Sequence, residues 1–236
     1  SYYTVNTLYK NIIYDENHTS GTANSTEEYK DKQGRVVLKR TYGDSDENMD
    51  GVISGANEIN VKHDTYYIYD DYGNLTYILP PKMDASSTAL ATVISQLDEL
   101  GYQYKYDKRN RLVKKKIPGK DEEYIIYDNL DRPVLTQDAL LRADDKWLFT
   151  KYDVFGRVAY TGIYSHTTTL SRSAMQTHLN TNRAADVSHY EEKTSTGDYY
   201  TNSDFPSSNC EILTLNYYDN YTFNRAGATA AVTSFG

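Results

Sequence analysis

The stretch YKYDKRNRLV at residues 104–113 returns twice with small changes, as IIYDNLDRPV at residues 125–134 and as TKYDVFGRVA at residues 150–159. Each copy holds a Tyr-Asp pair, two variable residues, a turn-prone Asn, Asp or Gly, and then Arg. A fourth copy, IYDDYGNLTY, lies upstream at residues 68–77, and a degenerate fifth, EYKDKQGRVVL, at residues 28–38. Repetition of this kind reflects architecture before chemistry, because one such unit needs its neighbours to bury a face.

Each copy has the pattern of a strand, a tight turn and a return strand. The Tyr ring suits a covered sheet face, and the Asp at the strand end can accept hydrogen bonds from the amide groups of the turn. Gly or Asn suits the left-handed turn position, and the Arg begins the return strand. Because neighbouring hairpins cover each other's open edges, the sequence predicts a mainly β fold in which YD hairpins form one continuous, curled sheet.

The composition supports half-buried strands and limits the partners. Tyr is in excess, with 25 Tyr against 5 Phe and 1 Trp. The formal net charge of -8 argues against nucleic acid or an anionic membrane as partner. No apolar run approaches the roughly 20 residues of a membrane span, so membrane insertion is not expected. The single cysteine, Cys210, cannot form an intrachain disulfide.

The hairpin pattern divides the chain into three predicted segments. Residues 1–26 are predicted to form one or two leading strands and a loop. Residues 27–165 hold the YD hairpins, interrupted by an acidic insert at residues 43–60. Residues 166–236 are predicted to continue with hairpins and a small-residue exit segment. Five hairpins are too few to close on themselves, so the chain is expected to be a fragment of something longer.

Short stretches of the chain change to a helical period. Apolar side chains at i, i+3, i+4, i+7 and i+10 predict a helix near residues 88–100, with Gly101 as a left-handed terminator. A second short helix is predicted near residues 171–179, with Ser171 as its N-cap. A helical turn near residues 139–142 also fits the sequence. The predicted fold is therefore β with one or two short helices.

The repeated phrases also carry a family resemblance. TEEYKDKQGRVVLKRTY, DELGYQYKYDKRNRLVKKKIPGK and LDRPVLTQDALLRADDKWLFTKYDVFGRVAYTG resemble the Rhs/YD-repeat family, in the form found in very large secreted or surface proteins of Bacteroidetes-type bacteria. The resemblance covers roughly residues 27–165. It implies a spiral of β-hairpins that forms part of a hollow shell, and a secreted or cell-surface location.

The resemblance also implies partners. In that family the shell commonly encloses a carboxy-terminal toxin or other cargo, and some relatives act at the cell surface. The expected partners are therefore the remainder of a larger chain, an enclosed cargo and secretion machinery. The family's core also holds an autoproteolytic region with paired aspartates. This chain has no DPxGxxG-like segment, so self-cleavage is not carried over.

One constellation resembles a metal site. The insert DSDENMDGVISGANE at residues 44–58 places oxygen ligands and a turn glycine at the spacing of a calcium loop. Its twelfth position is Asn57, with Glu58 one residue later, and no flanking helix is evident, which argues against an EF-hand. A plain acidic surface loop is the alternative. The candidate Ca²⁺ ligands are Asp44, Asp46, Asn48, Asp50, the Val52 carbonyl and Glu58.

No other pattern in the sequence indicates a reaction. GxSxG, P-loop and GxGxxG motifs are absent, and the five histidines have no zinc-site spacing. We therefore expect a non-enzymatic structural segment whose hairpins build a β-shell around a toxin or other cargo. The alternative is a surface adhesin or glycan-binding module, in which rows of exposed Tyr rings stack on surface glycans.

Overall fold

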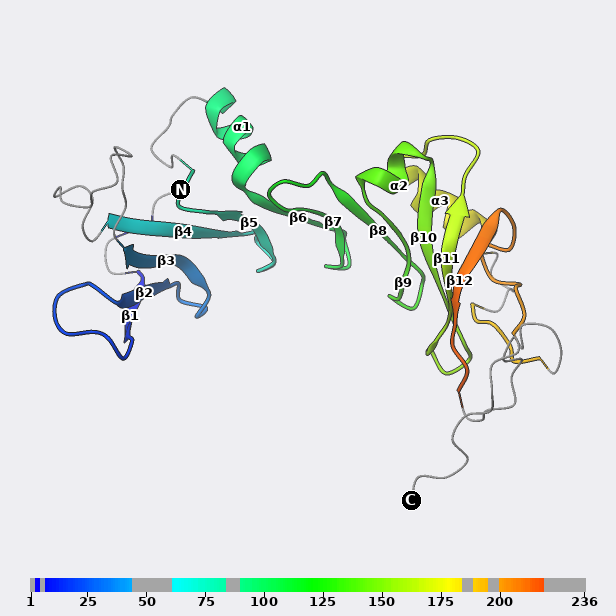
Figure 1. Cartoon of the computed structure of the whole chain (residues 1–236), viewed down its shortest axis with the longest axis horizontal. Helices are drawn as coiled ribbons and strands as arrows, with labels where there is room; N and C mark the ends of the chain where they lie inside the picture. Colours follow the sequence, from blue (N-terminus) through cyan, green and yellow to red (C-terminus); the bar gives the residue numbers. More distant parts are fainter. Residues whose placement is uncertain are drawn as a thin grey trace, which may run out of the picture. The chain divides into compact units, whose positions relative to one another are not determined.

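The computed structural model describes residues 3–4, 7–43, 61–83, 90–183, 189–194 and 200–218 of the 236-residue chain. Its strands are antiparallel, and their order in the sheet follows the sequence from β1 to β12. Figure 1 shows them as successive hairpins. The predicted mainly β fold of consecutive YD hairpins in one sheet is confirmed.

The chain divides into two compact units, Ser1–Lys120 and Asp121–Gly236. This boundary falls inside the predicted hairpin segment at residues 27–165. The division of the chain by repeat content into residues 1–26, 27–165 and 166–236 stays a prediction.

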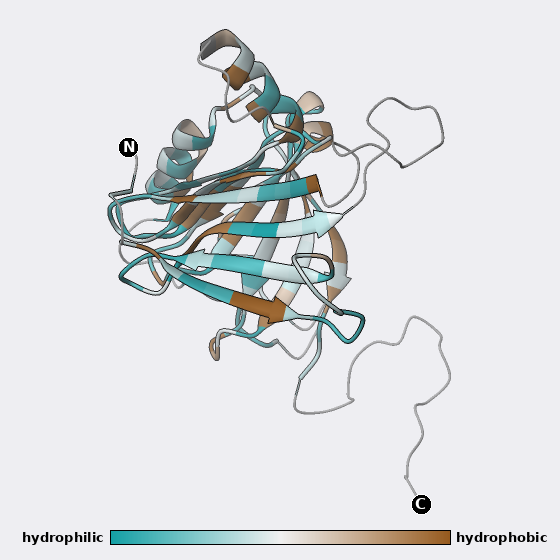
Figure 2. Cartoon of the chain, turned by 90° about the vertical axis from the view of Figure 1, so that its left-hand side faces the viewer, coloured by the Kyte–Doolittle hydropathy of each residue, from teal (hydrophilic) through white to brown (hydrophobic). Residues whose placement is uncertain are grey.

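The first unit is a series of antiparallel strands with one helix. In Figure 2 the strands facing the viewer are hydrophilic or neutral over most of their length, with shorter hydrophobic segments. Its described buried apolar side chains are few, namely Val37, Met83 and Val113. Most side chains on β2 to β7 are instead half-buried. Its elements are β1 (Tyr9–Tyr14), β2 (Ser25–Lys30), β3 (Val36–Gly43), β4 (Val61–Tyr69), β5 (Leu75–Leu79), α1 (Leu90–Leu100), β6 (Tyr102–Tyr106) and β7 (Leu112–Lys116).

The helix α1 lies where the apolar period predicts it, but the role expected for Gly101 is wrong. Gly101 is absent from the described residues with positive φ. A Cβ at this position would lie 2.5 Å from the Leu97 Cδ1 atom and 2.9 Å from the Leu97 carbonyl oxygen. Glycine is required here because the chain turns back tightly against the last helical turn.

The second unit contains the hydrophobic core. Trp147, Phe149 and Tyr160 on its strands pack with Met175 and Leu179 on its last helix, and all five side chains are almost completely buried. Its elements are β8 (Glu123–Tyr127), β9 (Pro133–Gln137), α2 (Ala139–Ala143), β10 (Lys146–Tyr152), β11 (Val158–Ser165), α3 (Arg172–Asn182) and β12 (Cys210–Leu215). Three helices are thus described, where the sequence predicts one or two.

Side-chain caps and a close strand contact fix this unit. The Ser171 hydroxyl accepts a hydrogen bond from the Ala174 amide at 3.3 Å, so the predicted N-cap of α3 is confirmed. In the β10–β11 pair, Phe149 stands directly opposite Gly162. A Cβ at Gly162 would lie 2.6 Å from the Phe149 ring and 2.1 Å from the Glu211 carbonyl oxygen. The missing side chain therefore lets the ring lie over the strand.

Candidate functional site

The Asp of each YD hairpin organises its own turn. In the β6–β7 hairpin, one carboxylate oxygen of Asp107 accepts hydrogen bonds from the Arg109 amide at 2.9 Å and the Arg111 amide at 3.0 Å. Its other oxygen accepts from Arg111 Nε at 2.8 Å. The same three bonds recur at Asp31, Asp128 and Asp153, and at Asp70 with the Asn74 amide group in place of an Arg. The predicted role of Asp as a turn acceptor is confirmed.

The third residue after each Asp takes the left-handed conformation. Glycine supplies it at Gly34, Gly73 and Gly156, with φ of 81°, 85° and 77°. Asn110 and Asp131 adopt it with φ of 59° and 62°. Asn and Asp tolerate this region better than other side chains, so the three residue types of the repeat serve one backbone requirement.

In three hairpins the tyrosine before the turn Asp contacts the preceding hairpin. The Tyr69 hydroxyl donates to the Val36 carbonyl at 3.0 Å. Val36 is the first residue after Arg35, which ends the preceding turn. The same bond, to the same position of the preceding hairpin, joins Tyr106 to Leu75 at 3.0 Å and Tyr152 to Pro133 at 2.7 Å.

The arginine that ends one turn lies over the tyrosine ring of the next hairpin. The Arg35 guanidinium is 4.8 Å from the centre of the Tyr69 ring, and that of Arg132 is 4.5 Å from the Tyr152 ring. A guanidinium over an aromatic face contributes about 0.5–1 kcal/mol or more when it is shielded from water. We call the hydroxyl bond, together with the stacked Arg where the preceding turn ends in one, a hairpin joint.

A further joint follows β12, and the sequence pattern did not identify it. The Tyr218 hydroxyl donates to the Val158 carbonyl at 3.0 Å, and the Arg157 guanidinium lies 4.3 Å from the Tyr218 ring. Tyr218 is followed by an Asp in the sequence, and this Tyr-Asp pair is the one feature of the repeat that could have indicated the joint. The complete repeat is absent here, because no turn residue and Arg follow this pair at the usual spacing.

Burial and hydrogen bonding shift the pKa values of the turn carboxyl groups in opposite directions. Burial raises the pKa of the Asp107 carboxyl, but the bonds from Arg111 and the turn amides outweigh it and hold this pKa below its usual value. The Asp31 carboxyl follows the same balance through Arg35. Burial raises the pKa values of the joint tyrosines Tyr69, Tyr106 and Tyr152, so their hydroxyls stay protonated donors.

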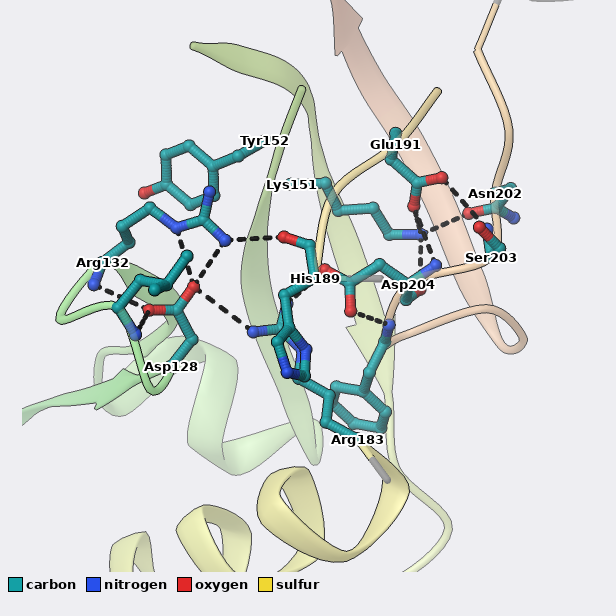
Figure 3. Close-up of polar contacts among 12 residues, drawn as sticks. Asp128, Arg132, Lys151, Tyr152, Arg183, His189, Glu191, Asn202, Ser203 and Asp204 are labelled. Carbon is teal, nitrogen blue, oxygen red and sulfur yellow. Dashed lines mark hydrogen bonds and ion pairs between the residues drawn. The ribbon is translucent and has the colours of Figure 1, made fainter. Parts of the chain in front are cut away.

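A cluster of buried charges lies beside the joints of the second unit. The Lys151 ammonium on β10 donates to Glu191 Oε1 at 2.9 Å, to the Asp204 carbonyl at 2.9 Å and to the Asn202 side-chain oxygen. Neither the Lys151 nor the Glu191 side chain has any exposed surface. Figure 3 shows Lys151 pointing from its strand into the segment that carries Glu191, Asn202 and Asp204. We call residues 189–194 and 200–206 the strap.

Arginines connect the strap to the turns. Arg183, after α3, pairs with the Asp204 carboxylate and lies 3.4 Å from the Asp128 carboxylate. Arg132 Nη2 donates to the His189 carbonyl at 2.6 Å. Burial raises the pKa of the Asp204 carboxyl despite the nearby Arg183 guanidinium. The strap is thus held on the hairpins by polar contacts, which Figure 3 displays, and by Tyr200 and Phe205, which pack in or against the hydrophobic core.

Two hollows lie away from this cluster. In the first unit a half-open groove of about 840 Å³ is lined by Tyr72, Tyr77, Tyr104 and Tyr106 together with polar side chains. In the second unit, His166 and His178 line a cavity of about 270 Å³, with their ring centres 4.9 Å apart. The two histidines are separated in the sequence and show no zinc-site spacing. Only the fold of β11 and α3 brings them together.

The predicted calcium ligands lie outside the described residues, so the Ca²⁺ site stays a prediction. Within the ranges that the structure describes, no group of three or more His, Cys, Asp or Glu residues is placed to hold a metal ion. In those ranges no helix is long and apolar enough to cross a membrane. The undescribed candidate ligands are Asp44, Asp46, Asn48, Asp50, Val52 and Glu58.

Comparisons with known proteins give distant structural similarity. The chain is built from YD hairpins. No family model and no curated protein matches it. A solved structure of TcdB2-TccC3 is similar to 62% of this chain, with 15% sequence identity and a TM-score of 0.45. TcdB2-TccC3 without its hypervariable C-terminal region is similar to 61%, with 16% identity and the same TM-score.

A TcdB2-TccC3-Cdc42 structure gives the same values as the first, with 15% identity over 62% of this chain and a TM-score of 0.45. This chain spans 6% of the length of each of these matched chains. At this level of similarity, the fold assignment rests on the strand order and pairing of the chain itself.

Proposed function

We propose that this chain is a non-enzymatic structural segment of a larger secreted or cell-surface protein of the Rhs/YD-repeat type, and that its hairpins build a β-shell around a toxin or other cargo. The hairpin joint is the observation that supports this function. The same hydroxyl bond links Tyr69, Tyr106, Tyr152 and Tyr218 to the hairpin before each of them. A contact that repeats from hairpin to hairpin lets a wall be extended without new chemistry at each step.

The distribution of polar groups agrees with a structural role. The carboxylates of the turns are occupied by amides and guanidinium groups, as at Asp107 and Asp128. A general acid or base needs a carboxyl that faces its substrate. The turn carboxylates instead hold the backbone of their own hairpins.

Protease protection in the full-length protein tests the proposal. We expect the segment enclosed by the shell to resist an added protease. A variant with Tyr69→Phe, Tyr106→Phe and Tyr152→Phe should lose part of this protection, because three joints are weakened. The matched control changes the exposed tyrosines, with Tyr9→Phe, Tyr72→Phe and Tyr77→Phe. Digestion of the enclosed segment at the same rate in the native and unfolded protein would exclude a shell.

Glycan binding is the second candidate function, and the tyrosine-lined groove favours it. Tyr72 is 81% exposed and Tyr77 36% exposed, so their rings are accessible for stacking on sugar rings. A glycan array probed with the chain should show binding that Tyr72→Ala and Tyr77→Ala abolish together. Tyr9→Ala, another exposed tyrosine outside the groove, is the matched control. Equal binding by the wild type, the double variant and the control would mean that the groove does not contact glycans.

A further inference from the structure

The arrangement around Lys151 has the components of an amide-forming site. Lys151 lies on β10, opposite Tyr160 on β11, and its amine faces the side chains of Glu191 and Asn202 from the strap. Lys151 and Asn202 are 51 residues apart in the sequence. Figure 3 shows the Asn202 amide oxygen turned toward the Lys151 side chain. The Lys151 amine therefore already contacts the amide oxygen of Asn202 and the Glu191 carboxylate.

Aromatic rings surround the Lys151 side of this contact, while Asn202 lies on its exposed side. Lys151 Nζ is 5.8 Å from the centre of the Phe149 ring, and Phe149 is completely buried. Tyr160 and Tyr200 are 1% and 7% exposed, and their ring centres lie 5.7 Å apart. Keeping an ammonium and a carboxylate charged in such surroundings costs free energy that a neutral amine and a neutral acid avoid.

We propose that Lys151 and Asn202 form an intramolecular amide bond, with Glu191 as the proton-transfer group. Glu191 takes a proton from the Lys151 ammonium, and the resulting amine attacks the side-chain carbonyl carbon of Asn202. A carbon–nitrogen bond forms and the carbonyl π electrons move to the oxygen.

Collapse of this intermediate breaks the original carbon–nitrogen bond of Asn202. Glu191 moves a proton from the attacking nitrogen to the departing nitrogen, which leaves as ammonia. The proton first taken from Lys151 goes to that ammonia, so ammonium is released and Glu191 returns to the carboxylate. Atoms and charge balance, and no oxidant or co-reactant is needed.

The strap holds each group where this reaction requires it. Glu191 Oε2 accepts from the Thr201 hydroxyl at 2.7 Å and the Ser203 amide at 3.0 Å, and Oε1 accepts from the Asp204 amide at 3.1 Å. These bonds fix the carboxyl group beside Lys151, and fixed proximity replaces a bimolecular encounter. Asn202 itself is exposed, so released ammonia has a direct path to solvent.

This inference is independent of the proposed shell function. A bond between Lys151 and Asn202 would fasten the strap covalently to β10, whatever the larger protein does. A buried, fully hydrogen-bonded ion pair is the alternative explanation of the same geometry. The two differ in one measurable property, because only the reaction removes an ammonia from the chain.

Intact-mass spectrometry of the folded 236-residue chain tests the proposal. The expected mass is lower than the sequence mass by one ammonia, about 17 Da. Trypsin digestion should yield a branched peptide joining Lys151 to Asn202, with no cleavage after Lys151. Asn202→Ala should restore the full mass of its own sequence, whereas Asn180→Ala, another exposed asparagine, should keep the loss.

Glu191→Gln tests the proton-transfer role, because it keeps the shape of the side chain and removes its acid. We expect this variant to show the full mass with a folded circular dichroism spectrum. If it does not fold, Asn202→Ala still decides the question, since Asn202 lies at the exposed rim. A folded wild-type chain that keeps its full sequence mass after prolonged incubation, or whose branched peptide joins other residues, overturns the proposal.

Discussion

At the residue scale, each turn depends on one Asp carboxylate that accepts several hydrogen bonds from the turn itself. Asp107 accepts from two backbone amides and pairs with the Arg111 guanidinium, so its loss removes the acceptor that these groups share. The neighbouring hairpin offers a contrast in Asp71, which is exposed and adjoins the turn Asp70. Asp107 and Asp71 have the same side chain but differ in their hydrogen bonds, so Asp71 is a matched control for Asp107.

We predict that Asp107→Ala lowers the free energy of unfolding by about 1–3 kcal/mol, the usual cost of unsatisfied partners. The measurement is urea denaturation followed by circular dichroism. Asp71→Ala is the control and should change stability by less than about 0.5 kcal/mol, as exposed substitutions do. Equal effects of the two substitutions would contradict the turn role of Asp107.

The pH dependence of stability follows from the same carboxylates. Because the pKa values of Asp31 and Asp107 are lowered in the folded chain, their contribution is complete above the usual carboxyl pKa of 3.8. It is lost as the pH falls through their lowered folded values. Asp204 has the opposite sign, since its raised pKa gives a contribution present at low pH and lost as the pH rises through its folded value.

We therefore predict that the urea midpoint is nearly constant above about pH 5 and falls steeply in more acidic solution. Asp107→Ala should make this acid-side fall shallower, because one of the responsible groups is gone. Fluorescence-monitored urea titrations from pH 2 to 7 would check this. A midpoint that rises on acidification would mean that Asp204 outweighs the turn carboxylates.

At the element scale, the hairpin joint connects one pair of strands to the next through a single hydroxyl and a stacked ring. At Tyr106 the joint depends most on the hydroxyl bond, because the preceding turn ends in Asn74 instead of an arginine. Tyr106→Phe removes the oxygen and keeps the ring, so it isolates the hydrogen bond.

We expect Tyr106→Phe to destabilise the chain by about 1 kcal/mol, the net value of one such bond. Tyr72→Phe is the control, because Tyr72 is 81% exposed and lies on the preceding turn. Both variants can be compared by urea denaturation under identical conditions. If the Tyr106 variant matches the wild type, the hydroxyl bond does not hold the hairpins together.

The contact of β10 with β11 gives a second prediction for an element. Gly162→Ala should destabilise the chain by about 1–3 kcal/mol, since the added Cβ meets the Phe149 ring and the Glu211 backbone. Gly43→Ala is the matched control, as its Cβ would lie 3.3 Å from the end of the His63 ring, a side chain that can move. Thermal unfolding of both variants is the measurement, and a larger loss for Gly43→Ala would contradict it.

The calcium prediction belongs to the insert at residues 43–60. Isothermal titration should give binding heat with the wild type and none with Asp46→Ala plus Asp50→Ala, since both carboxylates are candidate Ca²⁺ ligands. Asp71→Ala plus Asp121→Ala, two exposed acidic residues elsewhere, should leave the heat unchanged. The absence of heat with the wild type would remove the calcium site.

At the scale of the whole molecule, local features were predictable and distant ones were not. The YD turns, the strand order and the Ser171 cap depend on residues within a few positions of each other, so the sequence pattern contains them. The Lys151–Glu191 pair joins positions 40 residues apart, and no spacing rule connects them. The same holds for the contact of Arg132 with His189, 57 residues away.

Gly101 and Tyr218 show why even local patterns mislead. Glycine after a helix usually indicates a left-handed residue, but here a close approach to Leu97 requires it. Tyr218 forms a joint although no regular turn follows it, because the joint depends on the tyrosine and the preceding hairpin alone. A search for complete repeats therefore undercounts the joints of the chain.

The backbone character of the turn bonds has an evolutionary consequence. The Asp carboxylate accepts a hydrogen bond from the backbone amide of the second residue after it. In the five turns that residue is Gln33, Tyr72, Arg109, Leu130 or Phe155. Any residue with an amide hydrogen can occupy this place, so only proline is barred. The hairpin tips are thus free to diversify, and new surface specificities can arise there while the scaffold beneath them stays unchanged.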